Sequence, residues 1–161
     1  MKTTSYKIIL SVILALLSSS CTPYVSKMKE TKNYSQLALY GANNNLLCRL
    51  LVVYGHYSFY PGAACPNDKA YYFSVENPRE GVIFSITESY ANLHSCSGAG
   101  AEYQIIDPIP GQPTARVPVG AAFTVPEGKE IVPGVVARRW YGANRPIEGK
   151  VSCVVMWRDG H

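Results

Sequence analysis

The sequence predicts an all-β fold, an antiparallel β-sandwich or partly closed barrel of about seven strands stapled by two disulfides. Apolar and polar residues alternate with a period of two along several segments, and clusters of turn-forming residues separate these segments. Four cysteines follow an N-terminus that has the features of an export signal. No convincing amphipathic helix follows residue 36, so helices are not expected to contribute a layer.

The first strands come from the residues after position 34. The segment SQLALYGA, residues 35–42, fits either an opening strand or one short helical turn. In GVIFSITESY, the apolar side chains of Val82, Phe84 and Ile86 share one face, and Ser85 and Thr87 take the other. The same alternation occurs in KVSCVVMWRD, near the C-terminus. Five further strands are predicted at residues 47–60, 70–75, 101–106, 115–125 and 130–141.

Ahead of this region, the N-terminus is typical of a secretory signal peptide. Lys2 and Lys7 lie ahead of an apolar run from Ile8 to Leu17, and three serines follow this run. A spanning helix needs roughly 20 apolar residues, so a run of ten is too short to cross a bilayer. The alternative is an ordinary N-terminal helix buried in a core, but such a helix would carry polar residues at helical spacing.

The residues around Cys21 refine this prediction. The stretch Leu17-Ser18-Ser19-Ser20-Cys21 resembles the lipobox of bacterial lipoprotein precursors, with Ser19 and Ser20 at its small positions and Ser18 where leucine is usual. The resemblance implies cleavage before Cys21, which would carry the membrane-anchoring lipid, palmitate included. In enteric-type lipoproteins, Thr22 in place of aspartate implies sorting to the outer membrane. A plain secreted form cut nearby is the alternative.

The mature chain is expected to be one domain on a tether. Residues 1–20 form the signal peptide, residues 21–35 are polar and charged as in a flexible tether, and residues 36–161 form a single sandwich domain. Loss of Lys2 and Lys7 leaves 13 basic and 11 acidic side chains, a net charge of +2. This charge is too small for a nucleic-acid binder, which needs a dense basic stripe.

Four cysteines remain after Cys21, and an even number in an exported domain predicts two disulfides. Three pairings exist. The proximity of first and last strands in a sandwich favours Cys65–Cys96 and Cys48–Cys153. A zinc site using His94, Cys96 and His56 is the rival interpretation, but the chain has no C-x-x-C pair.

The sequence contains no catalytic motif, and we expect no enzyme and no cofactor. Ser97 lies in SCSGAG, which lacks the leading glycine and the helix of a nucleophile elbow. His56 and His94 are candidate bases only if a serine or carboxylate lies within reach. Carboxylates that a glycosidase would need are present but sit near predicted turns: Glu76, Glu80, Glu88, Glu102 and Asp107.

Two sets of residues are candidates for binding. Arg138, Arg139, Trp140, Tyr141 and Arg145 gather at a strand end running into a turn, and Trp, Tyr and Arg dominate interface hot spots. Strand alternation directs Arg138 and Trp140 to one face and Arg139 and Tyr141 to the other. The alternative is a solvated edge strand whose arginines discourage edge pairing.

The second set is a candidate ligand platform of aromatic residues at alternating positions: Tyr57, Phe59, Tyr71 and Phe73. Flat aromatic faces with polar tips suit sugars, whereas plain cross-strand packing is the competing explanation.

These features predict a lipid-anchored binding or structural protein of the cell envelope, with the outer membrane, facing the periplasm or the cell surface, as its expected location. The favoured role is an accessory subunit of an envelope assembly such as a secretion or conjugation apparatus, with envelope proteins as partners. The alternative is a carbohydrate-binding or hydrolase-inhibiting module that contacts a glycan.

Overall fold

The computed structural model describes residues 34–158 except 61–62, 64, 93–94 and 143–145. The predicted signal peptide, Cys21 and the tether up to Asn33 lie outside the described residues, as do His94 and Arg145. Within the described part, no helix combines the length and apolar character needed to cross a membrane.

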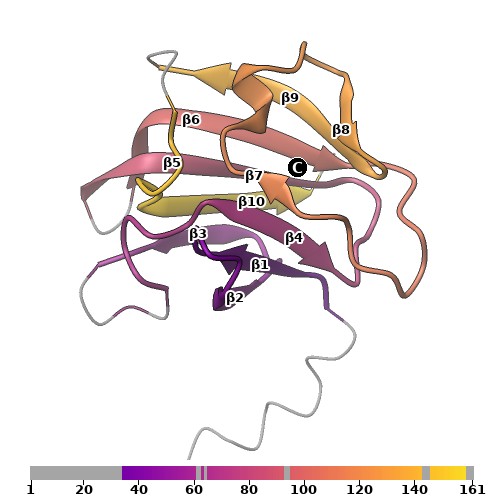
Figure 1. The fold of residues 1–161 in the computed structure, drawn as a ribbon, viewed down its shortest axis with the longest axis horizontal. Coiled ribbons are helices and arrows are strands. Elements are labelled where there is room, and N and C mark those ends of the chain that lie inside the picture. The colour runs from indigo at the N-terminus through magenta and orange to yellow at the C-terminus, as the bar shows by residue number, and fades with distance from the viewer. Residues whose placement is uncertain (1–33, 61–62, 64, 93–94, 143–145, 159–161) are drawn as a thin grey trace, which may run out of the picture. The chain divides into compact units, whose positions relative to one another are not determined.

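Two antiparallel sheets make up the domain (Figure 1), which confirms the predicted all-β class; the sheets do not close into a barrel. One sheet has four strands in the order β2-β1-β4-β7: β1 (Gln36–Tyr40), β2 (Leu46–Leu51), β4 (Tyr72–Glu76) and β7 (Val117–Pro118). The other has six in the order β3-β10-β5-β6-β9-β8: β3 (Gly55–Ser58), β5 (Val82–Asn92), β6 (Ser95–Ile105), β8 (Glu130–Val132), β9 (Val135–Tyr141) and β10 (Cys153–Arg158).

Three aromatic side chains join the two sheets in the core. Phe73 of β4 meets Phe84 of β5 and Tyr103 of β6, with ring centroids 5.1 and 4.7 Å away. All three are fully buried, and each removes a large apolar surface from water. The hydroxyl of Tyr103 donates a hydrogen bond to the carbonyl of Val119 at 2.7 Å, which satisfies its polar atom inside the core.

Some predicted strands are divided in the structure. Residues 47–60 form β2 and β3, which belong to different sheets, because the chain turns a corner between Leu51 and Gly55. Residues 130–141 form the hairpin of β8 and β9, with Pro133 and Gly134 as its turn and Gly134 at a φ of +84°. These divisions help to raise the count from about seven strands to ten.

The structure also decides between the two alternatives for one segment and shortens the predicted strand in another. Residues 36–40 form a strand rather than a helical turn, held between β2 and β4. Of residues 115–125, only Val117 and Pro118 pair with a neighbouring strand, although the N–H of Val119 still donates to the carbonyl of Tyr71, just before β4. The chain continues into a short 3-10 helix at Ala121–Phe123.

Two disulfides are present as predicted, but the favoured pairing was wrong. The bridges are Cys48–Cys65 and Cys96–Cys153. The expectation placed the first and last strands side by side, whereas β2 and β10 lie in different sheets. Cys65 follows β3, which comes directly after β2. The bridge from Cys65 to Cys48 therefore closes a short loop of chain that contains β3.

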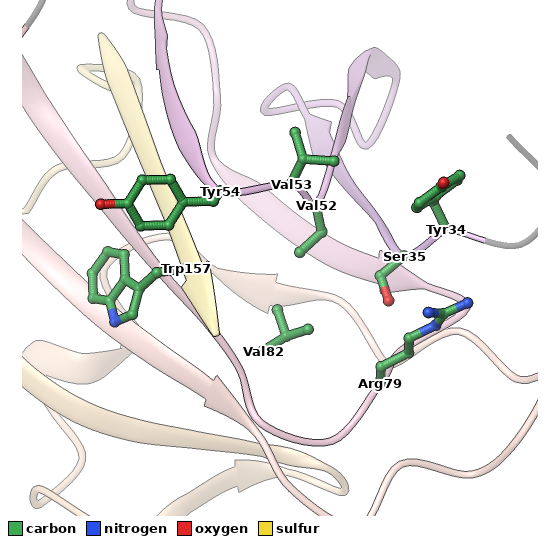
Figure 2. A pocket seen from close by; sticks show the side chains of 8 residues that line it. All are labelled: Tyr34, Ser35, Val52, Val53, Tyr54, Arg79, Val82 and Trp157. Atoms are coloured by element: carbon green, nitrogen blue, oxygen red, sulfur yellow. The ribbon is translucent and has the colours of Figure 1, made fainter. Parts of the chain in front are cut away.

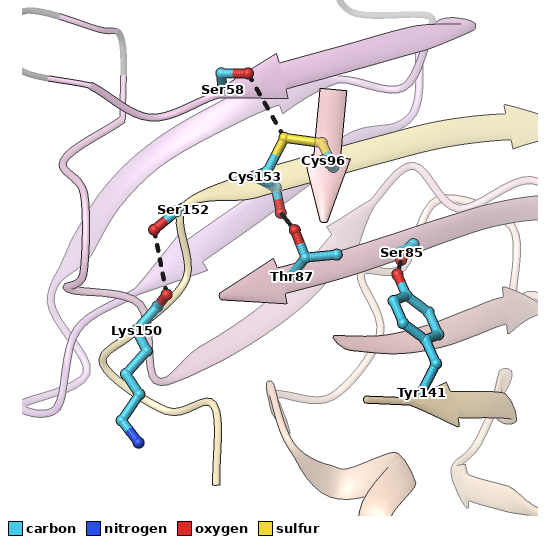
Figure 3. Close-up of a disulfide and its surroundings, with 8 residues drawn as sticks. All are labelled: Ser58, Ser85, Thr87, Cys96, Tyr141, Lys150, Ser152 and Cys153. Carbon is cyan, nitrogen blue, oxygen red and sulfur yellow. Dashed lines mark hydrogen bonds between the residues drawn. A yellow bond between two sulfur atoms is a disulfide. The ribbon is translucent and has the colours of Figure 1, made fainter. Parts of the chain in front are cut away.

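The second bridge ties the β5–β6 hairpin to β10. Cys153 lies opposite Thr87 of β5, while Cys96 lies farther along the hairpin, opposite Tyr90. A break in register between Thr87 and Ser89 marks a bulge, and bulges bend strands. Figure 3 shows Cys96 reaching Cys153 at the start of β10, beside the Thr87 side chain.

Candidate functional site

The predicted arginine and aromatic cluster lies on β9, between β6 and β8. We call Arg138, Arg139 and Trp140 the β9 surface, because all three side chains retain solvent exposure. The fifth predicted member, Arg145, lies outside the described residues.

Both arginines of the β9 surface bind one buried carboxylate. Nε of Arg138 lies 3.2 Å from Oε1 of Glu102, and Nε of Arg139 lies 2.9 Å from Oε2. The Glu102 side chain is only 4% exposed, and a buried charge at such a site requires a partner. The arginine side chains remain 37% and 61% exposed, so both are accessible to a partner from solvent.

This arrangement corrects the predicted alternation along β9. Neighbouring residues of a regular strand point to opposite faces, which would separate Arg138 from Arg139. In the structure, Glu102 pairs with Arg139 and Tyr103 with Ala137, so Arg138 is the extra residue of a bulge. Because a bulge redirects a side chain, both arginines reach Glu102.

Trp140 points to the other face of the sheet, because it pairs with the core residue Ala101, whereas Arg139 pairs with Glu102. The Trp140 side chain is 46% exposed, and its ring lies 5.8 Å from that of Phe123, centroid to centroid. Phe123 belongs to the 3-10 helix that follows β7 and supports one side of the indole. A large, partly supported aromatic ring loses little rotational freedom on binding, which suits an interface anchor.

Tyr141 is a structural residue rather than an exposed contact. Its ring lies over Gly100, where an added Cβ would approach the ring carbon Cζ to 2.8 Å. Its hydroxyl forms a hydrogen bond with the hydroxyl of Ser85 (Figure 3). Burial raises the pKa of Tyr141, so the phenol stays neutral well above neutral pH.

The structure does not assemble the predicted aromatic platform. Phe59 and Phe73 are 1% and 0% exposed and belong to the core. Tyr57 lies on β3 of the six-stranded sheet, whereas Tyr71 precedes β4 of the other sheet. The hydroxyl of Tyr57 donates to the carbonyl of Leu51 at 2.7 Å, and burial raises the pKa of Tyr57.

Residues considered for catalysis or metal binding are dispersed. Glu102 is held by two arginines, and Glu76 pairs with Arg49 at 2.9 Å. Cys96 is oxidised in a disulfide, which removes it as a metal ligand. Over the described stretches of the chain, no group of three or more His, Cys, Asp or Glu side chains could hold a metal ion.

A pocket that the sequence analysis missed lies where the chain crosses between the sheets. It encloses about 290 Å³, and Figure 2 shows Tyr54 and Trp157 on one side and Arg79 and Tyr34 on the other, with Val52 and Val82 between them. Tyr54 is 84% exposed, the largest exposure among the described large hydrophobic residues. The corner between β2 and β3 was not predicted, so no sequence pattern joined these residues.

Comparisons with protein-family models, with curated proteins and with solved structures find no match for this chain.

Proposed function

We propose that the protein is a lipid-anchored subunit of a cell-envelope assembly and binds a protein partner through the β9 surface. The observation that carries this proposal is the end of β9, where two arginines are fixed on buried Glu102 and exposed Trp140 lies on the other face of the strand. Trp and Arg are the residue types most enriched at interface hot spots. The exposed guanidinium groups favour a partner that presents carboxylates.

The anchor is a separate part of the proposal. It rests on the lipobox-like residues that end at Cys21, with two disulfides as support for an oxidising compartment. We expect metabolic labelling with a radioactive fatty acid to mark the wild-type protein and not a Cys21→Ser variant. Equal labelling of both would contradict the anchor without affecting the β9 surface.

The partner contact is tested by crosslinking in native cells, gentle solubilisation of the envelope and mass spectrometry of what co-purifies. We expect a reproducible set of envelope proteins with the wild type and their loss from the double variant Arg139→Ala, Trp140→Ala. In this variant Glu102 keeps its bond to Arg138, so the buried carboxylate is not left unpaired.

Arg49→Ala is the matched control, because Arg49 is also exposed and paired with a glutamate but lies on the four-stranded sheet. It should retain the partners. The proposal fails if the double variant keeps them at the same abundance, or if Arg49→Ala loses them equally.

A further inference from the structure

The pocket at the corner between the sheets has a second hollow beside it. This second hollow encloses about 270 Å³ and is lined by residues of β3 and β10, among them Gly55, His56 and Val155. Tyr54 and Trp157 line both hollows and form a ridge between them, which we call the aromatic ridge. Two adjacent hollows of similar size suit a ligand made of repeated units rather than a single compact molecule.

Packing of the core does not require Tyr54 of the aromatic ridge to be where it is. The Tyr54 side chain is almost fully exposed at 84%, and Tyr34 across the pocket is 48% exposed. Ligand pockets are lined mainly by hydrophobic and aromatic side chains, and contiguous exposed apolar surface can mark a ligand-binding groove. The C–H face of a sugar ring is apolar and stacks on such rings, while its hydroxyls reach polar tips like those of tyrosine and tryptophan.

Charge narrows the ligand further. Arg79 lies across the pocket from the aromatic ridge (Figure 2), and none of the described residues that line this pocket is acidic. A guanidinium group offers a planar fork of N–H donors that matches a carboxylate. A neutral sugar would make no use of that charge.

We infer that the two hollows bind an acidic glycan, an oligosaccharide that contains uronic acid units. One ring stacks on the aromatic ridge and its carboxylate pairs with Arg79, while a neighbouring ring enters the hollow beside Val155. This site lies on residues other than those of the β9 surface, so either proposal can fail without the other.

Tryptophan fluorescence tests this inference, because the chain has only two tryptophans. In the full-length protein, Trp140→Phe leaves Trp157 of the aromatic ridge as the sole indole. We would titrate this protein with a galacturonic acid tetrasaccharide and, separately, with a neutral galactose tetrasaccharide. We expect a saturable change in emission with both, and tighter binding of the acidic oligomer.

Two variants in the same background separate the roles of charge and stacking. Arg79→Gln should weaken binding of the acidic oligomer about tenfold or more, to the level of the neutral one, since a hydrogen bond to a charged group is lost. Tyr54→Ala should weaken the binding of both oligomers. Because the Tyr54 side chain is exposed, its loss should leave the fold intact, so weaker binding would not come from misfolding. Arg49→Gln, an exposed arginine of the other sheet, should bind like the parent.

Three results would overturn the inference. The first is no saturable response of Trp157 to either oligomer. The second is an equal loss in Arg79→Gln and Arg49→Gln, because a general charge effect would then explain the preference. The third is a response to phosphatidylglycerol vesicles but not to the acidic oligomer, which would make this face a membrane contact.

Discussion

Replacing Tyr103 with phenylalanine removes a single oxygen atom from the middle of the core. The ring is fully buried and keeps its contacts with Phe73 and Phe84 in the variant. The lost hydroxyl donates to the carbonyl of Val119 at 2.7 Å and lies 3.4 Å from the N–H of Ala122. Leaving these buried groups unpaired should lower the free energy of unfolding by about 1–3 kcal/mol at pH 7.

The same substitution has a distinctive dependence on pH. Burial raises the pKa of Tyr103 far above 10, its value in the unfolded chain. Above pH 10 the unfolded chain therefore releases a proton that the folded protein retains, and wild-type stability falls by roughly 1.4 kcal/mol per pH unit for this group. The variant lacks this loss. The stability difference between the two proteins should narrow by about 1.4 kcal/mol between pH 9 and pH 11.

Guanidinium unfolding at pH 7, 9 and 11 measures both effects. Tyr57 and Tyr141 also have raised pKa values, but they are present in both proteins and cancel in the difference. Tyr54→Phe serves as the control, because Tyr54 is 84% exposed and its substitution should leave stability unchanged at each pH. A stability difference for Tyr103→Phe that stays constant from pH 9 to pH 11 would refute the reasoning.

Two further perturbations test the disulfides and a turn. Replacing both cysteines of Cys96–Cys153, which are 57 residues apart, should cost about 4 kcal/mol, against about 3 kcal/mol for the other bridge with its separation of 17. Urea midpoints check this order, and a larger cost for the shorter loop would contradict it. Gly142→Ala should cost about 1–3 kcal/mol more than Gly111→Ala, because both have positive φ but only the first places a Cβ 2.7 Å from Ala99 Cα. Equal thermal midpoints for the two glycine variants would refute the predicted clash.

Period-two alternation was sufficient to predict the fold class. Val82, Phe84 and Ile86 are all buried in β5 as predicted, and so are Ile83, Ser85 and Thr87 on its other face. The same signal could not locate the corner after Leu51, because a strand that changes sheets keeps its β geometry and apolar residues on both sides. Turn chemistry at Pro133 and Gly134 was readable in the sequence and should have divided the predicted strand there.

The sequence predicted which residues form the candidate site, but it did not predict how they are arranged. The cluster of arginines and Trp140 was visible from residue type alone, but its partner Glu102 lies 36 residues before Arg138 and was linked to it only by strand pairing. A bulge at Arg138 then placed two consecutive side chains on one acid, which no regular period predicts. The aromatic ridge depends on residues 54 and 157, brought together by the order of strands in the six-stranded sheet.

The positions of the two terminal strands have a mechanical consequence. β1 is flanked by β2 and β4, and β10 is flanked by β3 and β5, so neither end of the domain is an edge strand. A pull that enters through the residues before Tyr34 acts along β1 and loads its hydrogen bonds to both neighbours together, in shear, instead of peeling them one at a time. Forced unfolding is governed by the rate of crossing the unfolding barrier. A domain held to a surface by its N-terminus would therefore transmit tension through a strand that is hydrogen-bonded on both sides.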